Sequence, residues 1–304
     1  MIITENEQLC SYKNGNVSVT LLKNGTKIRE FNSESERKGI FPESIDIKIT
    51  NYCDAGCRYC HEKSVKSGKH ADLTDLQNIL SKLKYTELAL GGGNPLSHPD
   101  LKEFLKWCRN NNFYASLTVN QIHIKENLNL LKELIESDLI YGLGISFISR
   151  NKKDMILINK LADKTDNIVF HLINGINEVS DPIYLLSEIN KPLKLLILGY
   201  KHYGRGINYY SESVKNKMNK WKEYITDIIS SGNLMLFSVL SFDNLAIEQF
   251  EIKKLMKKED FNSFYQGDEF SCSMYIDAVE QKFSVNSRNE IKTDYMNIKE
   301  YFNT

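Results

Sequence analysis

The sequence predicts an α/β protein whose central part is a partial, open (β/α)6 barrel. Apolar strand patterns alternate with helical patterns six times between residues 45 and 207, and glycine or polar residues follow several of the strands. Strands that alternate with helices form βαβ units and a parallel sheet. Six units within roughly 160 residues fall short of the eight units of a complete (β/α)8 barrel, so the barrel is expected to be open.

The individual elements follow from the spacing of apolar residues. Ile45 to Ile49 alternates between apolar and polar residues, as a strand does, whereas apolar residues in 98–111 recur at helical spacing. On the same grounds strands are predicted at 45–49, 87–90, 113–119, 141–148, 168–173 and 194–198. Helices are predicted at 72–83, 98–111, 126–137, 152–163 and 183–188.

Shorter parts precede and follow the barrel. Residues 1–44 are predicted to form a small β-hairpin appendage, because Asn14-Gly15 and Asn24-Gly25 are strong hairpin turn signals. Residues 208–304 are predicted to form an α+β extension that covers the barrel mouth. Its expected elements are helices at 210–230 and 245–257 and strands at 234–240, 273–277 and 281–285. The predicted parts are therefore 1–44, 45–207 and 208–304.

Composition excludes several classes of function. Lys and Arg together number 39, as do Asp and Glu, so the formal charge is zero and argues against a strongly basic nucleic-acid binder. No apolar run reaches the 18 residues expected of a membrane span, and the N-terminus does not resemble a secretory signal. A cytoplasmic protein with reduced thiols is expected.

Three of the six cysteines lie within eight residues, in the order Cys53-x3-Cys57-x2-Cys60. Thiolates at this spacing, directly after a strand, are suited to zinc or to an iron–sulfur cluster. Zinc would need a fourth ligand, and the neighbouring His61 is awkwardly placed for it. A disulfide conflicts with the expected compartment and with the odd number of thiols. Three thiolates suit a [4Fe–4S] cluster with one open iron, and the scattered remaining cysteines predict a single cluster.

These residues resemble the radical S-adenosylmethionine (radical SAM) superfamily, in which C-x3-C-x2-C follows the first strand of a short β/α barrel. The resemblance covers roughly residues 45–207. It implies that Cys53, Cys57 and Cys60 bind three irons, and that S-adenosylmethionine chelates the fourth. It also implies reductive cleavage of S-adenosylmethionine to a 5′-deoxyadenosyl radical, which takes a hydrogen atom from a substrate.

A second segment carries the same resemblance. Gly91-Gly92-Gly93-Asn94-Pro95 resembles the G-G-E-P segment of the superfamily, with Gly93 in the place of the usual acid. Glycines let backbone groups approach a ligand closely. The resemblance implies that this segment binds the methionine part of the cofactor, through backbone carbonyls or Asn94.

Further cofactor contacts are implied by position. Tyr59 precedes the third cysteine, where an aromatic residue near the adenine is common in the superfamily. Asn120 and Ser146 end strands and are placed to meet polar groups of the cofactor, although such residues also form turns. Ile173 resembles an apolar contact to adenine.

The substrate side is less defined. Lys201 and Arg205 follow the sixth strand and are expected to hold an anionic group of the substrate, unless they serve as structural cations. Asp243 follows a later strand and is a further candidate for substrate binding.

Candidates for catalytic roles lie near the cluster and in the extension. His61 and Glu62 follow the third cysteine directly and are expected at the barrel mouth. Cys272 is a candidate hydrogen-atom donor, or alternatively a small residue of the core.

We therefore expect a radical SAM enzyme acting on a small polar, anionic substrate, with flavodoxin or ferredoxin as electron donor. The main alternative is the same chemistry on a peptide or protein side chain, including activation of a glycyl-radical enzyme. In that case the N-terminal β segment could present a strand edge to a peptide. A non-enzymatic iron–sulfur or zinc-binding module ranks last. The whole chain also resembles a group of small bacterial and phage radical SAM proteins that have His-Glu after the third cysteine.

Overall fold

A large twisted sheet organises the computed structural model of the chain, which describes residues 7–31, 39–81, 83–232, 236–265, 273–288, 292–294 and 298. The strand order is β10-β9-β8-β7-β6-β5-β4-β11-β12-β13, and all neighbours from β10 to β11 are parallel. The predicted strands are β4 (Ser44–Thr50), β5 (Glu87–Gly92), β6 (Tyr114–Asn120), β7 (Gly142–Ser146), β8 (Ile168–Ile173) and β9 (Lys194–Leu198). The predicted α/β fold with a partial, open barrel is confirmed.

Two further parallel strands flank these six. β10 (Val239–Phe242) pairs with β9, and β11 (Ser273–Asp277) pairs with β4, 220 to 230 residues earlier in the chain. The antiparallel strands β12 (Lys282–Ser284) and β13 (Thr293–Asp294) continue the sheet beyond β11. The C-terminal part therefore extends the barrel wall instead of only lying over its mouth.

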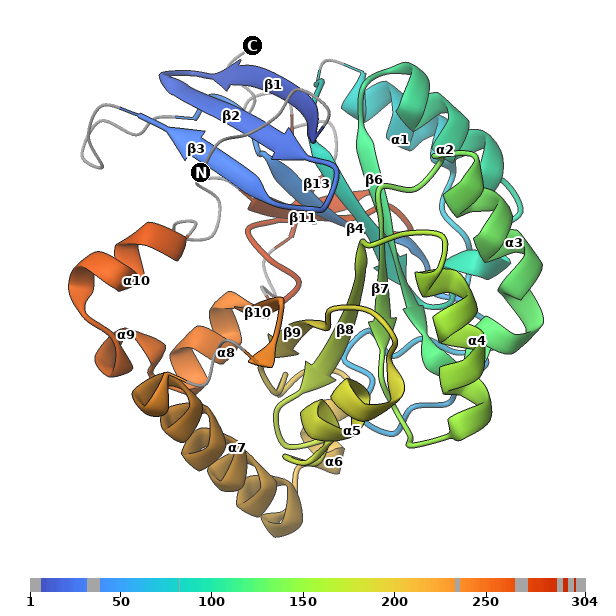
Figure 1. The fold of residues 1–304 in the computed structure, drawn as a ribbon. Coiled ribbons are helices and arrows are strands. Elements are labelled where there is room, and N and C mark those ends of the chain that lie inside the picture. The colour runs from blue at the N-terminus through green and yellow to red at the C-terminus, as the bar shows by residue number, and fades with distance from the viewer. Residues whose placement is uncertain are drawn as a thin grey trace.

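Helices cover the outer face of the sheet (Figure 1). They are α1 (Leu73–Leu80), α2 (Leu101–Asn110), α3 (Ile124–Glu136), α4 (Lys152–Ala162) and α5 (Asp181–Glu188). α2 illustrates why they form: its buried residues recur at helical spacing and face the strands. Asp72 caps α1 by accepting a hydrogen bond from the backbone N–H of Thr74, at 2.8 Å.

The C-terminal part contributes further helices, of which α8 packs against β9 and β10. They are α6 (Gly206–Tyr209), α7 (Glu212–Ser231), α8 (Asn244–Gln249), α9 (Ile252–Leu255) and α10 (Lys258–Phe264). Ser211 caps the start of α7, and Gly232 ends it in the left-handed conformation with φ 70°. Trp221 of α7 is fully buried, and its Nε1 donates to the carbonyl oxygen of Asn177 at 2.8 Å.

The N-terminal residues form a separate antiparallel sheet of β1 (Gln8–Asn14), β2 (Val17–Leu22) and β3 (Lys27–Glu30). Gly15 and Gly25, in the two predicted turns, have φ of 63° and 90°. This sheet lies at the amino ends of the barrel strands, opposite to their arrowheads (Figure 1). There Tyr141, before β7, donates to the carbonyl oxygen of Leu22 at 2.7 Å, and Lys194, at the start of β9, donates to that of Asn24 at 2.6 Å.

Among the described residues, no helix is both long enough and apolar enough to cross a membrane.

Candidate active site

A cavity of about 550 Å³ opens inside the barrel and reaches the loops at the carboxyl ends of its strands. These ends are where (β/α) barrels place their active sites. The three clustered cysteines, the glycines at the end of β5 and the polar residues at the ends of β6 and β7 all line this one cavity. Residues that lie up to 93 positions apart in the sequence, from Cys53 to Ser146, therefore share a single site.

Cys53, Cys57 and Cys60 are free thiols, partly buried, on the loop that follows β4. Backbone hydrogen bonds fold this loop back on itself, from Cys53 N to Val65 O at 3.0 Å and from Val65 N to Asn51 O at 3.1 Å. Burial raises the pKa of the Cys53 and Cys57 thiols, so a metal would have to displace their protons.

Arg205 supports the cysteine loop from the segment after β9. Its Nε donates to the carbonyl oxygen of Cys57 at 2.9 Å, and its Nη1 donates to that of Ser64 at 3.0 Å. Its backbone N–H donates to the carbonyl oxygen of Cys60, also at 2.9 Å. The guanidinium that the sequence suggests for a substrate anion is thus engaged with the chain itself.

The glycine segment lies against the start of the cysteine loop. Gly93 N donates to Thr50 O and Asn94 N donates to Tyr52 O, both at 2.7 Å. A Cβ atom on Gly93 would lie 2.1 Å from Tyr52 O, so no side chain fits there. Gly91, Gly92 and Gly93 line the cavity with backbone groups.

The Asn94 side chain has a local role in this structure. Its Oδ1 accepts from Leu96 N at 3.2 Å, and its Nδ2 donates to Ser97 Oγ at 2.8 Å, which caps the 3₁₀ helix Pro95–Ser97. Asn94 and Pro95 are buried beside the cavity but are not among its lining residues. Of the two possibilities for contacting a cofactor amino group, the backbone of 91–93 is the one that faces the cavity.

Asn120, Ser146, Tyr59 and Ile173 all line the cavity, as expected for cofactor contacts. The Asn120 Nδ2 lies 3.6 Å from the Sγ of Cys57, within reach of a hydrogen bond to sulfur. Asn120 and Ser146 are register partners on adjacent strands, so the two polar groups lie side by side at the ends of β6 and β7.

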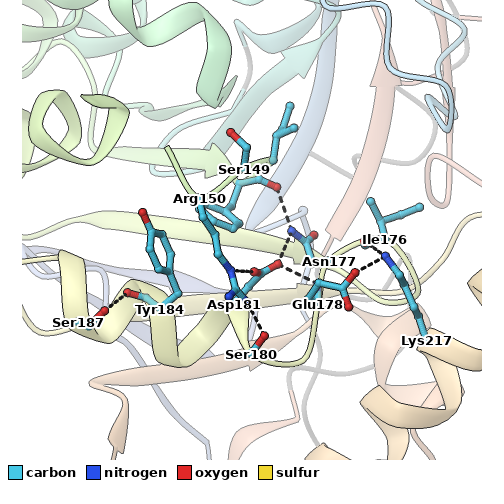
Figure 2. A network of polar contacts seen from close by, with 12 residues as sticks. Ser149, Arg150, Ile176, Asn177, Glu178, Ser180, Asp181, Tyr184, Ser187 and Lys217 are labelled. Atoms are coloured by element: carbon cyan, nitrogen blue, oxygen red, sulfur yellow. Dashed lines mark hydrogen bonds and ion pairs between the residues drawn. The ribbon is translucent and has the colours of Figure 1, made fainter. Parts of the chain in front are cut away.

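The loop after β8 is held by a polar network around Asn177 (Figure 2). Asn177 accepts from Ile173 N at 2.7 Å and donates to Phe147 O at 3.1 Å. Asp181 accepts from Glu178 N at 2.8 Å and from Arg150 Nε at 2.9 Å. This network fixes the segment that presents its apolar residues to the cavity.

His61 and Glu62 lie at the cavity wall and belong to a chain of charged contacts. Glu62 contacts Lys48 Nζ at 3.1 Å, His61 Nε2 at 3.2 Å and the hydroxyl of Tyr275 at 3.1 Å. Burial alone would raise the pKa of Glu62, but its contacts with His61 and Lys48 outweigh burial and hold the pKa well below its usual range. Lys48 also contacts Asp277 at 3.1 Å.

Lys201 lines the cavity, but its ammonium is engaged. Its Nζ donates to Ser287 Oγ at 2.8 Å and lies 3.1 Å from His61 Nε2. Burial, and then the nearby Lys201 ammonium, lowers the pKa of His61.

The two remaining candidates are not part of the cavity wall as described. Asp243 caps α8 by accepting from Ala246 N at 2.7 Å, and it also accepts from Gly199 N at 2.9 Å. It therefore supports the segment after β9 and is absent from the lining residues. Cys272 lies outside the described residues.

The polar residues of the cavity wall that sequence reasoning missed include these four: Asp46, Lys48, His171 and Tyr275. Three of them lie inside β4 and β8, where strand alternation points every second side chain into a barrel. The Asp-x-Lys pattern in Ile45–Ile49 was the available signal, because polar residues at alternate positions of an inner barrel strand must face the cavity.

The donor set fits a [4Fe–4S] cluster with three protein ligands. Three free thiols line one face of a cavity that has room for a further ligand, and the Asn120 amide is placed to donate to one sulfur. His61 is paired with Lys201 and Glu62, so it is not free to complete a tetrahedral zinc site with the thiols.

Comparison with known proteins agrees with this arrangement. The sequence model of the Radical SAM superfamily matches residues 47–191. A protein of Methanocaldococcus jannaschii, named as a glycyl-radical enzyme activating enzyme, is 28% identical over an alignment of 209 positions that covers 62% of this chain and 79% of the relative. A protein of Methanothermobacter thermautotrophicus named as a GTP 3′,8-cyclase is 31% identical over 90 residues, 28% of this chain and 30% of the relative.

Among solved structures, Streptococcus suis SuiB has a similar fold, with a TM-score of 0.61 and 14% identity over 97% of this chain and 86% of SuiB. SuiB bound to its precursor peptide SuiA matches with a TM-score of 0.58 and 14% identity over 84% of this chain. SuiB bound to S-adenosylmethionine matches with a TM-score of 0.58 and 15% identity over 86% of this chain. The chain spans 63% and 65% of those two chains. The cysteine loop and the glycine segment both lie within residues 47–191, and this part of the chain matches the Radical SAM superfamily.

Proposed function

We propose that the chain cleaves S-adenosylmethionine reductively and directs the resulting radical to a small polar substrate held in the barrel cavity. The observation that carries this proposal is that the three thiols and the glycine segment line the same cavity. Backbone hydrogen bonds also join the glycine segment to the start of the cysteine loop. When bound, a reduced [4Fe–4S] cluster supplies the electron that splits the sulfonium and releases a 5′-deoxyadenosyl radical, which takes a hydrogen atom from substrate.

The chain's own residues would position these partners. Cys53, Cys57 and Cys60 would ligate three irons, and the backbone of 91–93 would meet the methionine end of the cofactor. Asn120 and Ser146 would contact its polar groups. The barrel wall would separate the reaction from bulk water, which is the protein's usual contribution where a cofactor carries the chemistry.

His61, Glu62 and Lys201 would form the polar wall on the substrate side. Their mutual contacts hold them in place before a substrate binds, so little rearrangement would be needed. Asp243 and Arg205 support this region through backbone contacts. Cys272 stays a candidate hydrogen-atom donor from the extension.

The second candidate is the same chemistry on a peptide or protein side chain. It is favoured by the relative named as a glycyl-radical enzyme activating enzyme and by SuiB with its precursor peptide. The N-terminal sheet does not favour it, because β1–β3 lie at the amino ends of the barrel strands, away from the cysteine loop.

The test is anaerobic reconstitution of the full chain with iron and sulfide, followed by incubation with S-adenosylmethionine and dithionite. We expect about four irons per chain and release of 5′-deoxyadenosine. Stoichiometric zinc without iron, or iron without cleavage, would contradict the proposal. Replacing dithionite by reduced flavodoxin or ferredoxin tests the proposed electron donor.

Release of 5′-deoxyadenosine also separates the two kinds of substrate. Stimulation by a pool of small metabolites supports the first candidate. Stimulation only by a co-purified protein or peptide supports the second.

A further inference from the structure

Asp46 occupies an unusual position in the middle of β4. This strand lies inside the sheet, between β5 and β11, yet Asp46 is exposed, and the surface it faces is the barrel cavity. Its register partners are Ala89 on β5 and Tyr275 on β11. Four residues separate Asp46 from the end of the strand, so it lies deep below the cysteine loop.

The row across the sheet from Asp46 consists of small residues. Ala89 pairs with Ser116 on β6, and Ser116 pairs with Gly142 on β7. All of them line the cavity. This row, Asp46-Ala89-Ser116-Gly142, is called the cavity floor below. Its small side chains leave space directly beside the carboxylate.

The carboxylate has no partner on the described part of the chain, where it makes neither a hydrogen bond nor an ion pair. The other charged groups on the cavity wall are engaged. Lys48 contacts Glu62 and Asp277, Lys201 contacts His61 and Ser287, and Arg205 contacts two backbone carbonyls. The polar group that the floor offers to a ligand is therefore a carboxyl group, and a cation beside it would favour its ionised form.

A carboxylate enclosed by protein is stabilised best by a cationic hydrogen-bond donor. Enclosure raises the pKa of Asp46, the nearby positive charge of Lys201 opposes this rise, and the nearby Asp243 carboxylate adds to it. A second positive charge at the floor would offset the remaining cost of enclosing the ionised Asp46 carboxylate. An anionic group would instead meet an uncompensated like charge.

We propose that the cavity floor is a subsite for a positively charged amine of the substrate, bound by Asp46. This inference rests on the proposed function and narrows its substrate to an amine-bearing compound. It differs from the anionic substrate expected from Lys201 and Arg205, because both of those cations are already engaged with the chain. Asp46 is thus a specificity-determining residue and not a group that takes part in radical formation.

The binding test uses butylammonium as the probe, with butanol and butyrate as neutral and anionic controls of the same length. Saturation-transfer NMR on the reconstituted full chain measures the dissociation constants. We expect butylammonium to bind most tightly, and Asp46→Asn to weaken it about tenfold, as loss of a charge-assisted hydrogen bond would do. Tighter binding of butyrate, or an unchanged butylammonium affinity in Asp46→Asn, would overturn the proposal.

Thermal unfolding separates a binding role from a structural one. Because Asp46 has no ion pair to lose, Asp46→Asn should keep the Tm of the wild type or raise it by up to about 3 °C. A clear fall in Tm would show that Asp46 stabilises the fold through Lys201, which would overturn the subsite. Asp227→Asn, on the exposed face of α7, is the matched control and should change neither Tm nor butylammonium affinity.

Release of 5′-deoxyadenosine without substrate distinguishes failure of the amine subsite from failure of the proposed function. Release by the wild type, together with amine binding that Asp46→Asn loses, supports both proposals. Release by the wild type with amine binding unchanged in Asp46→Asn overturns the subsite alone. Absence of release from both proteins contradicts the proposed function.

Discussion

The carbonyl oxygen of Tyr52 lies 2.1 Å from the point that a Cβ atom on Gly93 would occupy. The glycine segment and the cysteine loop are thus in direct backbone contact, joined also by the hydrogen bond from Asn94 N to Tyr52 O. This contact makes the position of the cysteines depend on the absence of a side chain at residue 93.

Gly93→Ala should therefore displace the cysteine loop. We expect a loss of about 3 kcal/mol in the free energy of unfolding, because the clash is with backbone and cannot be relieved by rotating a side chain. Chemical denaturation and iron content after reconstitution measure the effect. Gly91→Ala is the matched comparison, since its Cβ would lie 3.7 Å from Thr118 Cβ, an ordinary contact, and it should keep both stability and iron.

Replacement of Cys53, Cys57 or Cys60 by Ala should each abolish stable cluster binding. Iron content should fall from about four per chain to well under one, together with the visible absorbance of the cluster. Cys10→Ala is the control, because Cys10 lies in β1 and is not among the residues of the cavity wall. Full iron content in any of the three variants would refute its assignment as a ligand.

Arg205→Lys should weaken the cysteine loop even though it keeps the positive charge. Lysine cannot reproduce the two hydrogen bonds to the carbonyl oxygens of Cys57 and Ser64, so we expect a loss of about 2 kcal/mol in stability. Iron should also be lost to a chelator more rapidly. Arg109→Lys, at an exposed position on α2, serves as control. If Arg205 instead bound a substrate anion, the variant would change substrate affinity and leave iron retention intact.

Asn177→Ala should release the loop that carries Ile173. The change removes hydrogen bonds to Ile173 N and Phe147 O and leaves these backbone groups without their partner, at a cost of about 3 kcal/mol. We also expect weaker binding of S-adenosylmethionine, measured by equilibrium dialysis. Asn129→Ala, exposed on α3, should alter neither quantity.

His171 should make the fold sensitive to acid. Burial lowers its pKa to about 4, below its usual value of 6.5. The unfolded chain then binds a proton between pH 6.5 and 4 that the folded chain does not, so stability is full above pH 6.5 and falls as the pH is lowered. The loss amounts to about 3 kcal/mol at most. Denaturation curves of His171→Gln should show a shallower fall over this window, and an unchanged slope would refute the assignment.

Most of the barrel could be predicted from sequence, because local apolar periodicity determines each β/α unit. The strands at 45–49 and 168–173 and the helix at 98–111 all have counterparts in the structure. The sequence predicts the strand β11 but does not predict that it pairs with β4, because no local pattern encodes a pairing between segments some 230 residues apart.

The site was predictable where chemistry depends on spacing and not where it depends on tertiary contacts. The cysteine and glycine motifs are local, and both line the cavity. The engagement of Arg205 with two carbonyls, and the isolation of Asp46, arise only when distant segments meet. Residue type alone therefore suggests an anionic substrate, whereas the assembled cavity presents a carboxyl group that has no partner among the described residues.

The sheet at the amino ends of the barrel strands has a kinetic consequence. Because Tyr141 and Lys194 hold the β2–β3 hairpin across that end, we expect a compound bound at Asp46 to enter and leave on the side of the cysteine loop. S-adenosylmethionine, seated against that loop, would then stand between the floor and the solvent. Turnover should follow a compulsory order in which substrate arrives first, and a large excess of S-adenosylmethionine should act as an inhibitor by occupying the enzyme before its substrate does.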